Sequence, residues 1–331
     1  MKQMMLGLFL LLLSLWNLVF GWADQLALLC YISIALLFAG VIVFGLGYAK
    51  TGRSTPAAPP ALAPAPAEQE SAALVEELFR ELSALPQVEA IALGGSRAGE
   101  VYDEASDYDV YLYCTGPVPE ETRRAILSRY CFLTELGNHF WEYEDNCILK
   151  SGVEMDILYR DLDSFCADVA SVVEQCQPRN GYTTCMWHNL LTCRILYDRS
   201  GRLAQAKQRF DVPYPPALKE AILRRSRALL WESLPAYEGQ IKKAAKRRDL
   251  VSLNHRTAAF LESYFDLLFA LNEQTHPGEK RLVQLCRETC AILPAHFEEN
   301  LHQLFDHLFS APEKVPADLR RILEALKPLL P

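Results

Sequence analysis

Two long apolar runs near the N-terminus constrain this chain more than any other feature. Residues 4–22 and 26–48 are predominantly apolar, and each run has about the 20 residues that a helix needs to cross a hydrocarbon core of roughly 30 Å. Only residues 23–25 separate the two runs, which favours a tight hairpin. The sequence therefore predicts two transmembrane helices within residues 1–50.

Basic residues flank this predicted hairpin. Lys2 precedes the first run, and Lys50 and Arg53 follow the second. Because positively charged flanks stay in the cytoplasm, we expect a protein of the cell membrane whose remaining residues are cytoplasmic. An alternative is that the first run is a signal peptide with a cleavage site at residues 21–23; the second run would still exit toward the cytoplasm.

A proline-rich segment follows the hairpin. Residues 51–67 contain five prolines among alanines and a few polar residues. Because proline fixes φ and lacks a backbone N–H, this segment is expected to be an extended linker that spans up to about 50 Å.

The 264 residues after the linker have the composition of a soluble, acidic protein. They carry 40 acidic and 30 basic side chains, and this length is sufficient to bury a sizeable core. The charge balance argues against a nucleic-acid-binding protein that relies on a broad basic surface. The ten cysteines of the chain include no C-x-x-C pair, and Cys185, His188 and Cys193 lack the second ligand pair of a typical zinc site.

Three apolar segments are predicted strands, and they surround the polar motifs of the chain. An amphipathic helix is expected over residues 70–85, and a buried strand over 88–93 leads directly into a Gly-Gly-Ser-Arg sequence at 94–97. Residues 108–113 alternate as a half-buried strand does, and residues 153–159 form a third strand.

Three aspartates belong to these strands. Asp107 and Asp109 are two residues apart on an extended segment, so both carboxylates point to the same face. Two carboxylates this close repel each other unless a cation lies between them. Asp156, in the middle of the third strand, would complete a site for two Mg²⁺ ions, because Mg²⁺ prefers carboxylate and phosphate oxygens.

The glycines before these aspartates predict a phosphate-binding turn. The Gly-Gly-Ser sequence exposes backbone N–H groups without side-chain obstruction, and the N-terminus of a following helix would add further donors. The sequence therefore predicts an anion cradle suited to a triphosphate.

The order of these motifs resembles a known superfamily. Gly95-Ser96, ten residues, and then Asp107-Tyr108-Asp109-Val110 are similar to the signature of the DNA polymerase β-type nucleotidyltransferases. The longer segment 93–113 resembles their small-molecule branch, which includes the aminoglycoside and lincosamide adenylyltransferases. Residues 182–198 and 271–282 resemble bacterial nucleotidyltransferases that carry an uncharacterised helical domain.

The resemblance implies a role for each matching residue. Asp107 and Asp109 would hold the metal ions that bridge the triphosphate. Asp156 would bind the catalytic metal ion and help to deprotonate the acceptor hydroxyl. Transfer of the nucleotidyl group would then depend on positioning and on charge neutralisation.

Further residues are expected to bind the nucleotide. Ser96 and the backbone of Gly94 and Gly95 would contact phosphate oxygens, and Arg97 would neutralise their charge. In the resembling enzymes, a helical domain closes over the nucleotide and supplies a basic side chain, for which Lys280 is the candidate.

The C-terminal half is expected to be helical, apart from a short strand at 194–198. Prolines fall near the predicted helix ends, where they are tolerated, and no fixed-period repeat is present, so a helical bundle is preferred to a solenoid. The expected helices are 215–234, 237–248, 250–271, 278–292 and the last thirty residues.

Several other polar residues have an ordinary and a functional interpretation. A basic run at residues 242–248 is expected to be a solvated helix face, although it could contact anionic lipid or RNA. Glu142 and Glu144 are expected to be surface charges, and Glu154 a carboxylate at the rim of the site. His188 is expected to be a partly buried histidine with a hydrogen-bond partner, the alternative being a residue of the acceptor site.

The sequence thus predicts an α/β nucleotidyltransferase domain with a mixed sheet at residues 68–200 and a helical bundle at 201–331. Its activity would be Mg²⁺-dependent transfer of a nucleoside monophosphate, AMP from ATP, to a hydroxyl of a small molecule, with release of pyrophosphate. One alternative is a nucleotidyltransferase that acts on RNA or protein, although the acidic charge does not favour nucleic acid. Others are a non-catalytic nucleotide-binding scaffold and a structural membrane protein; the ordered carboxylates disfavour both.

Overall fold

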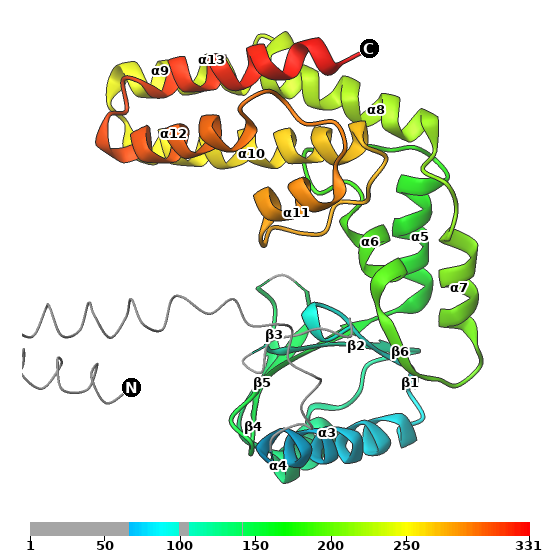
Figure 1. Cartoon of the computed structure of the whole chain (residues 1–331). Coiled ribbons are helices and arrows are strands. Elements are labelled where there is room, and N and C mark those ends of the chain that lie inside the picture. Colours follow the sequence, from blue (N-terminus) through cyan, green and yellow to red (C-terminus); the bar gives the residue numbers. More distant parts are fainter. Residues whose placement is uncertain (1–65, 99–105, 141) are drawn as a thin grey trace, which may run out of the picture. The chain divides into compact units, whose positions relative to one another are not determined.

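The computed structural model describes residues 66–98, 106–140 and 142–331 (Figure 1). The part from residue 66 to the C-terminus belongs to one compact unit. The predicted membrane hairpin and nearly all of the predicted linker lie outside the described residues. Among the described residues, no helix is both long enough and apolar enough to span a bilayer.

The described chain first builds a sheet with helices on both of its faces, and from α8 onward it is helical. The strands are β1 (Val88–Leu93), β2 (Tyr108–Cys114), β3 (Cys131–Asn138), β4 (Glu144–Leu149), β5 (Glu154–Arg160) and β6 (Arg194–Asp198). The helices around the sheet are α3 (Pro66–Ala84), α4 (Glu120–Tyr130), α5 (Leu162–Val173), α6 (Cys185–Thr192) and α7 (Arg202–Phe210). The remaining helices are α8 (Pro216–Arg227), α9 (Tyr237–Arg247), α10 (Leu250–Leu271), α11 (Leu282–Thr289), α12 (Phe297–Ser310) and α13 (Val315–Leu326).

The six strands form one mixed sheet in the order β3-β4-β5-β2-β1-β6. Strands β2 and β5 run parallel, and the other neighbouring pairs are antiparallel. The register of the parallel pair places Asp109 directly opposite Asp156. In the next pair, Asn146 of β4 lies opposite Asp156. A row of polar residues therefore crosses three adjacent strands.

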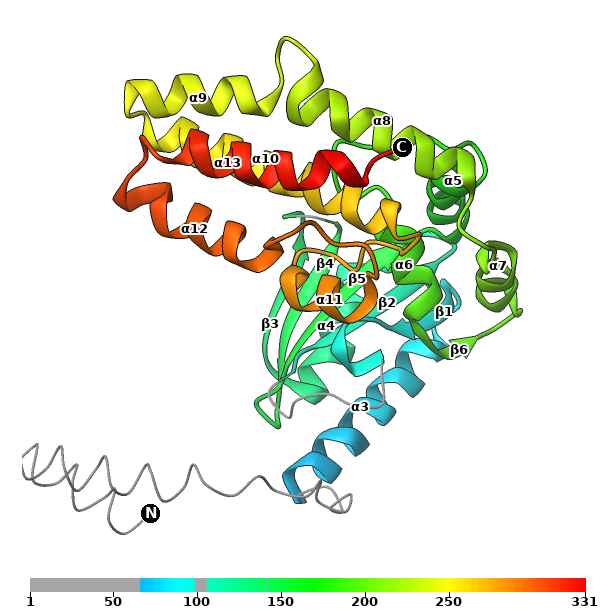
Figure 2. The ribbon, with the colours of Figure 1, turned by 45° about the horizontal axis from the view of Figure 1, so that its top comes forward.

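Alternation along β2 separates the two faces of the sheet. Tyr108, Val110 and Leu112 pack in the hydrophobic core beneath α3 and α4. Tyr111 and Tyr113 point to the opposite face, into a second core formed with α5, α6 and α7. Because side chains alternate along a strand, Asp109 lies on this second face. Figures 1 and 2 show α3 and α4 on one side of the sheet and α5 to α7 on the other.

Helices α8, α9, α11, α12 and α13 share one hydrophobic core with α10. The second half of α10 is almost completely buried. The core on the second face of the sheet also includes Leu203, Phe210, Leu218 and Ile222. This core therefore runs across the predicted domain boundary at residue 200, and the division into two domains stays a prediction.

The predicted mixed sheet followed by helices is confirmed, with local differences. Strands β3 and β4 were not expected from the sequence. Helix α3 begins at Pro66, inside the predicted linker, where proline is compatible with a first helical turn. Helix α11 begins at Leu282 instead of residue 278, because Gly278 and Arg281 both have a positive φ that interrupts a right-handed helix.

Candidate active site

Three carboxylates meet where β2 and β5 run side by side. Asp107, Asp109 and Asp156 are half-buried, and one oxygen of each lies within 4.8 Å of those of the other two. Among the described residues, no other group of three or more His, Cys, Asp or Glu side chains gathers in this way. The structure thus brings together the three aspartates that the spacing predicted; their catalytic role stays a prediction.

Gly94 and Gly95 leave room for side chains of β2. A Cβ on Gly95 would overlap Oδ2 of Asp109, and a Cβ on Gly94 would overlap the ring and hydroxyl of Tyr111. Gly95 also has a φ of +56°, which favours glycine. The two glycines are therefore required by their contacts with Asp109 and Tyr111, in addition to any role toward a phosphate.

The backbone of this turn differs from the expected phosphate cradle. The N–H of Gly94 donates a hydrogen bond to the carbonyl of Asp109 (2.8 Å), so it is engaged in the fold and not directed at a nucleotide. The helix that follows the glycines is a single 3₁₀ turn, Ser96–Ala98. The side chain of Ser96 lies outside the described part of the structure.

Arg97 is also placed differently from its predicted position. Its side chain is buried, with 5% exposure, and it does not line the cavity described below. Its Nε donates to the carbonyl of Ser106 (2.7 Å), and its guanidinium lies 4.1 Å from the centre of the Tyr108 ring. Arg97 thus ties the glycine turn to the start of β2, which explains its burial.

Asn146 holds Asp156 in place. Its Nδ2 donates to Oδ1 of Asp156 (2.7 Å), and its Oδ1 accepts a hydrogen bond from Asn138. These two amides connect β3 and β4 to the carboxylate on β5. Neither asparagine is recognisable from the sequence, because an isolated asparagine on a strand carries no local signal.

The electrostatics of the three aspartates favour a cation. Burial raises the pKa of Asp109, the charge of Asp107 raises it further, and Asp156 adds a smaller effect in the same direction. Lys280 acts against these effects and lowers the pKa of Asp109. The three converging carboxylates offer the oxygen ligands that Mg²⁺ prefers. The donor set therefore fits a divalent metal ion.

A cavity of about 1110 Å³ opens beside these carboxylates. Asp107, Asp109 and Gly95 line it from the sheet, and one face of α6 contributes a further wall. Lys280 and Arg281 line it from the segment between α10 and α11. The cavity thus has acidic groups on one wall and basic groups on another, and it is large enough for a nucleotide.

The floor of the cavity is fixed by a buried polar network. Arg160 is paired through two nitrogens with Glu142 (2.6 and 2.7 Å), and it donates to Asn189 (3.0 Å). Asn189 in turn donates to the hydroxyl of Tyr111, over whose ring the Arg160 guanidinium lies at 4.1 Å. Glu142 is therefore the partner of a buried arginine instead of the solvated surface charge that was expected.

The remaining candidates also have defined positions. Glu144 is buried on β4, contrary to the expectation of a surface charge, and Glu154 is exposed at the start of β5. His188 lines the cavity; its Nδ1 is 2.7 Å from the hydroxyl of Thr275, and burial lowers its pKa. His188 therefore has a hydrogen-bond partner, as expected, and also lies beside the candidate site.

The segment that carries Lys280 is anchored by buried hydrogen bonds. The N–H of His276 donates to Thr184 Oγ1 (2.8 Å), and Nδ1 of His276 accepts from the N–H of Gly278 (3.2 Å). His276 is completely buried, with its ring against those of Tyr182 and Phe269. The bond to Thr184 attaches the segment to the loop before α6, and the bond between Gly278 and His276 closes a turn within the segment.

A second pair of bonds attaches that loop to α10. Asp266 is buried at 2% exposure and accepts hydrogen bonds from both the N–H (2.9 Å) and the hydroxyl (2.6 Å) of Thr183. The loop before α6 is thus held from two sides, by α10 and by the Lys280 segment.

The chain is similar to one sequence family and to solved structures. A sequence model described as a domain of unknown function (DUF4037) matches residues 182–282, which include α6, α10 and the Lys280 segment. No curated protein matches the chain. One similar solved structure is a nucleotidyltransferase-like protein from Exiguobacterium sibiricum; its sequence identity is 10%, the match covers 78% of this chain and 73% of that chain, and the TM-score is 0.37.

Proposed function

We propose that the chain is an Mg²⁺-dependent nucleotidyltransferase that moves a nucleoside monophosphate, AMP from ATP, onto a hydroxyl of a small molecule. Two observations support this proposal: Asp107, Asp109 and Asp156 converge, and Asp107 and Asp109 line a cavity that Lys280 also lines. We further propose that residues 1–50 tether the enzyme to the cell membrane, with the catalytic part in the cytoplasm.

Two walls of the cavity would contact a bound triphosphate in different ways. Lys280 and Arg281 contribute positive charge on the wall formed by the segment before α11. Asp107, Asp109 and Asp156 would hold Mg²⁺, which when bound neutralises the charge of the phosphate groups. Tyr111, fixed by Asn189 and Arg160, shapes the floor between these groups.

The transfer itself needs one bond to form and one to break. The hydroxyl oxygen of the acceptor attacks the α-phosphorus, the bond between the α-phosphorus and the bridging oxygen breaks, and pyrophosphate leaves. Asp156 would accept the hydroxyl proton, since Asn146 holds one of its oxygens and thereby sets the direction of the other. The chain's main contribution would be positioning of the two reactants.

The proposal is tested with the full-length chain in a non-ionic detergent. The protein is incubated with Mg²⁺, a metabolite extract and each of the four NTPs labelled at the α-phosphate, and both pyrophosphate release and label in small molecules are measured. We expect labelled product with ATP and a loss of at least about 100-fold in the Asp107→Asn and Asp109→Asn variants. The exposed Asp211, replaced by Asn, is the matched control and should keep full activity.

Other outcomes point to other functions. Binding of NTP without pyrophosphate release, over a broad pool of acceptors, would favour a nucleotide-binding scaffold and contradict the enzyme. Label that appears only in added RNA or protein would retain the chemistry but contradict the small-molecule acceptor.

A further inference from the structure

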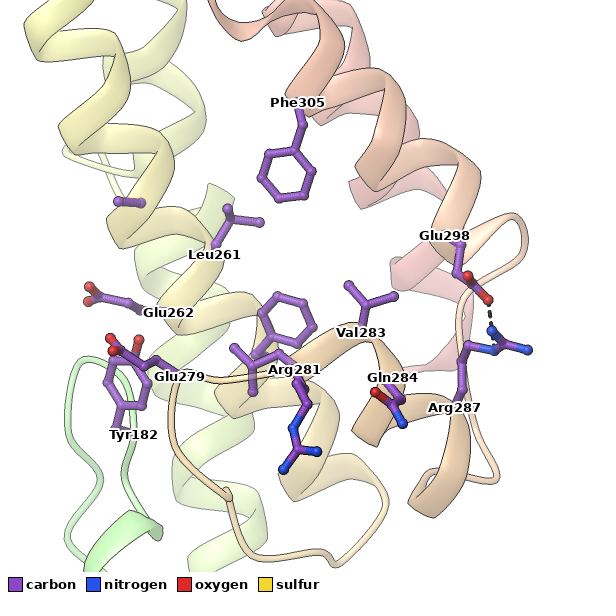
Figure 3. Close-up of a pocket in the computed structure, with 13 residues that line it drawn as sticks. Tyr182, Leu261, Glu262, Glu279, Arg281, Val283, Gln284, Arg287, Glu298 and Phe305 are labelled. Carbon is purple, nitrogen blue, oxygen red and sulfur yellow. Dashed lines mark ion pairs between the residues drawn. The ribbon is translucent and has the colours of Figure 1, made fainter. Parts of the chain in front are cut away.

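A second cavity, of about 660 Å³, lies between α10, α11 and α12 (Figure 3). None of the three aspartates lines it, so it is separate from the candidate active site. Arg281 is shared by the linings of the two cavities. The volume is within the range of cavities that bind small organic molecules, about 300–1000 Å³.

Much of the wall of this cavity is apolar. Ala258, Leu261 and Phe265 lie on one face of α10, and Val283 and Phe305 face them from α11 and α12. Phe305 is 46% exposed. A ligand with an apolar group that covers this ring would gain binding free energy from the burial of apolar surface. The cavity therefore offers a surface for the hydrocarbon body of a ligand.

One end of the cavity is acidic. Figure 3 shows the carboxylates of Glu262 and Glu279 on the same side, next to Tyr182. No hydrogen bond or ion pair joins either carboxylate to another residue in the described ranges. Burial raises the pKa of Glu262, and the charges of both glutamates add to the effect of burial in raising the pKa of Tyr182. Negative potential is thus concentrated there without a neutralising partner.

The basic residues of the lining do not neutralise this end. Arg287 forms an ion pair with Glu298 (2.8 Å) at the other side of the cavity, so these two charges satisfy each other. The guanidinium of Arg281 points away from Glu262 and Glu279 in Figure 3. One end of the cavity thus has uncompensated negative charge beside an aromatic ring, and the wall beyond it is apolar. This combination is complementary to an organic cation.

We propose that this cavity binds an organic cation that consists of a primary ammonium group on an apolar, ring-sized body. The ammonium group would lie between Glu262 and Glu279 beside the Tyr182 ring, and the body would cover Phe305 and Leu261. The proposal does not depend on nucleotidyl transfer, because binding is measured without any nucleotide.

The test compares two probes that differ only in their terminal polar group, which is charged in one and neutral in the other. Tryptamine carries the ammonium group, and tryptophol has the same ring with a neutral hydroxyl in its place. Their affinities for the full-length chain are measured by isothermal titration calorimetry at pH 7, with a detergent-only blank. We expect tryptamine to bind at least about fivefold more tightly, and the Glu262→Gln and Glu279→Gln variants to weaken tryptamine by about fivefold each without affecting tryptophol.

Two further variants locate the binding site. Glu299→Gln removes the same charge from an exposed position of α12 outside the cavity and should leave both affinities unchanged. Phe305→Ala removes apolar surface and should weaken both probes alike. Equal affinity of the unaltered chain for the two probes would overturn the proposal even if a variant failed to fold. Unchanged tryptamine binding in folded Glu262→Gln and Glu279→Gln proteins would overturn it as well.

Discussion

Gly95 lies so close to the carboxylate of Asp109 that any side chain at position 95 would displace that carboxylate. The turn after β1 lies against Asp109 of the neighbouring strand β2. The glycine is therefore coupled to the metal-binding geometry through sterics, whether or not its N–H contacts a phosphate. This relationship gives a direct mutational test of the three-aspartate site.

The Gly95→Ala variant is expected to lose divalent-metal affinity and activity by about 10–100-fold, the range seen when a residue that supports a metal ligand is altered. The new Cβ overlaps Asp109, and the positive φ adds strain of about 1–2 kcal/mol. Calorimetric titration with Mg²⁺ measures the effect. Gly239→Ala, where a Cβ meets nothing within 4 Å in α9, is the control and should keep parental affinity. Parental Mg²⁺ affinity in Gly95→Ala would contradict the steric coupling.

Replacement of Asn146 tests the orientation of Asp156. Asn146→Leu has a similar size but no donor for Asp156 Oδ1, so the carboxylate loses the bond that fixes its direction. We expect kcat to fall by about tenfold while the melting temperature changes little, because Asn146 is only partly buried. Pyrophosphate release under saturating ATP measures kcat. An unchanged kcat would show that Asp156 needs no such support.

Sequence reasoning found the elements that carry strong local patterns. Strands β1, β2 and β5 were predicted because each is a short apolar or alternating run, and the spacing of Asp107 and Asp109 was enough to place both on one face. Strand β3 escaped prediction because it is an edge strand: its consecutive Phe132 and Leu133 are both exposed, which breaks the alternation. An edge strand has a partner on only one side, so its burial pattern carries less information.

The contacts that sequence reasoning missed depend on the folded register. Asn146 meets Asp156 only through the pairing of β4 with β5, and Thr184 meets the N–H of His276 across 92 residues of chain. Arg97 was placed with the nucleotide because it follows the glycine turn, but the chain returns at Ser106 and buries it. Local spacing therefore predicted which carboxylates come together, and tertiary pairing determines which residues support them.

Thr184 is predicted to position Lys280. Thr184→Val keeps the shape of the side chain but removes the oxygen that accepts from His276, which leaves a buried N–H without its partner at a cost of about 1–3 kcal/mol. The Lys280 segment should loosen, and the KM for ATP should rise several-fold, while Lys280→Met alone should raise it by about tenfold.

A double-mutant cycle separates this effect from general destabilisation. If Thr184 acts through Lys280, Thr184→Val should raise KM little further in the Lys280→Met background. Independent, additive effects on KM would show that Thr184 has only a structural role. The four proteins are compared at a temperature at which unfolding measurements show all of them to be folded.

Asp266 is predicted to make stability depend on pH. Burial raises the pKa of Asp266 to about 6 despite its two hydrogen bonds from Thr183. Because the folded state then binds more protons than the unfolded state between pH 3.8 and 6, this group's contribution to stability is lost as the pH rises through that interval. The loss should amount to about 3 kcal/mol, at about 1.4 kcal/mol per pKa unit. Urea unfolding at pH 4 and pH 7 measures the change.

The Asp266→Asn variant isolates this contribution from other titrating groups. Its amide oxygen can still accept from the Thr183 N–H, but position 266 no longer titrates. His276, whose pKa burial lowers to about 3, acts with the opposite sign: its contribution is lost as the pH falls below about 6.5. It is present in both proteins and cancels in their difference. The stability of Asp266→Asn relative to the parent should therefore increase from pH 4 to pH 7. A constant difference, or one that decreases with pH, would show that folding does not raise the pKa of Asp266.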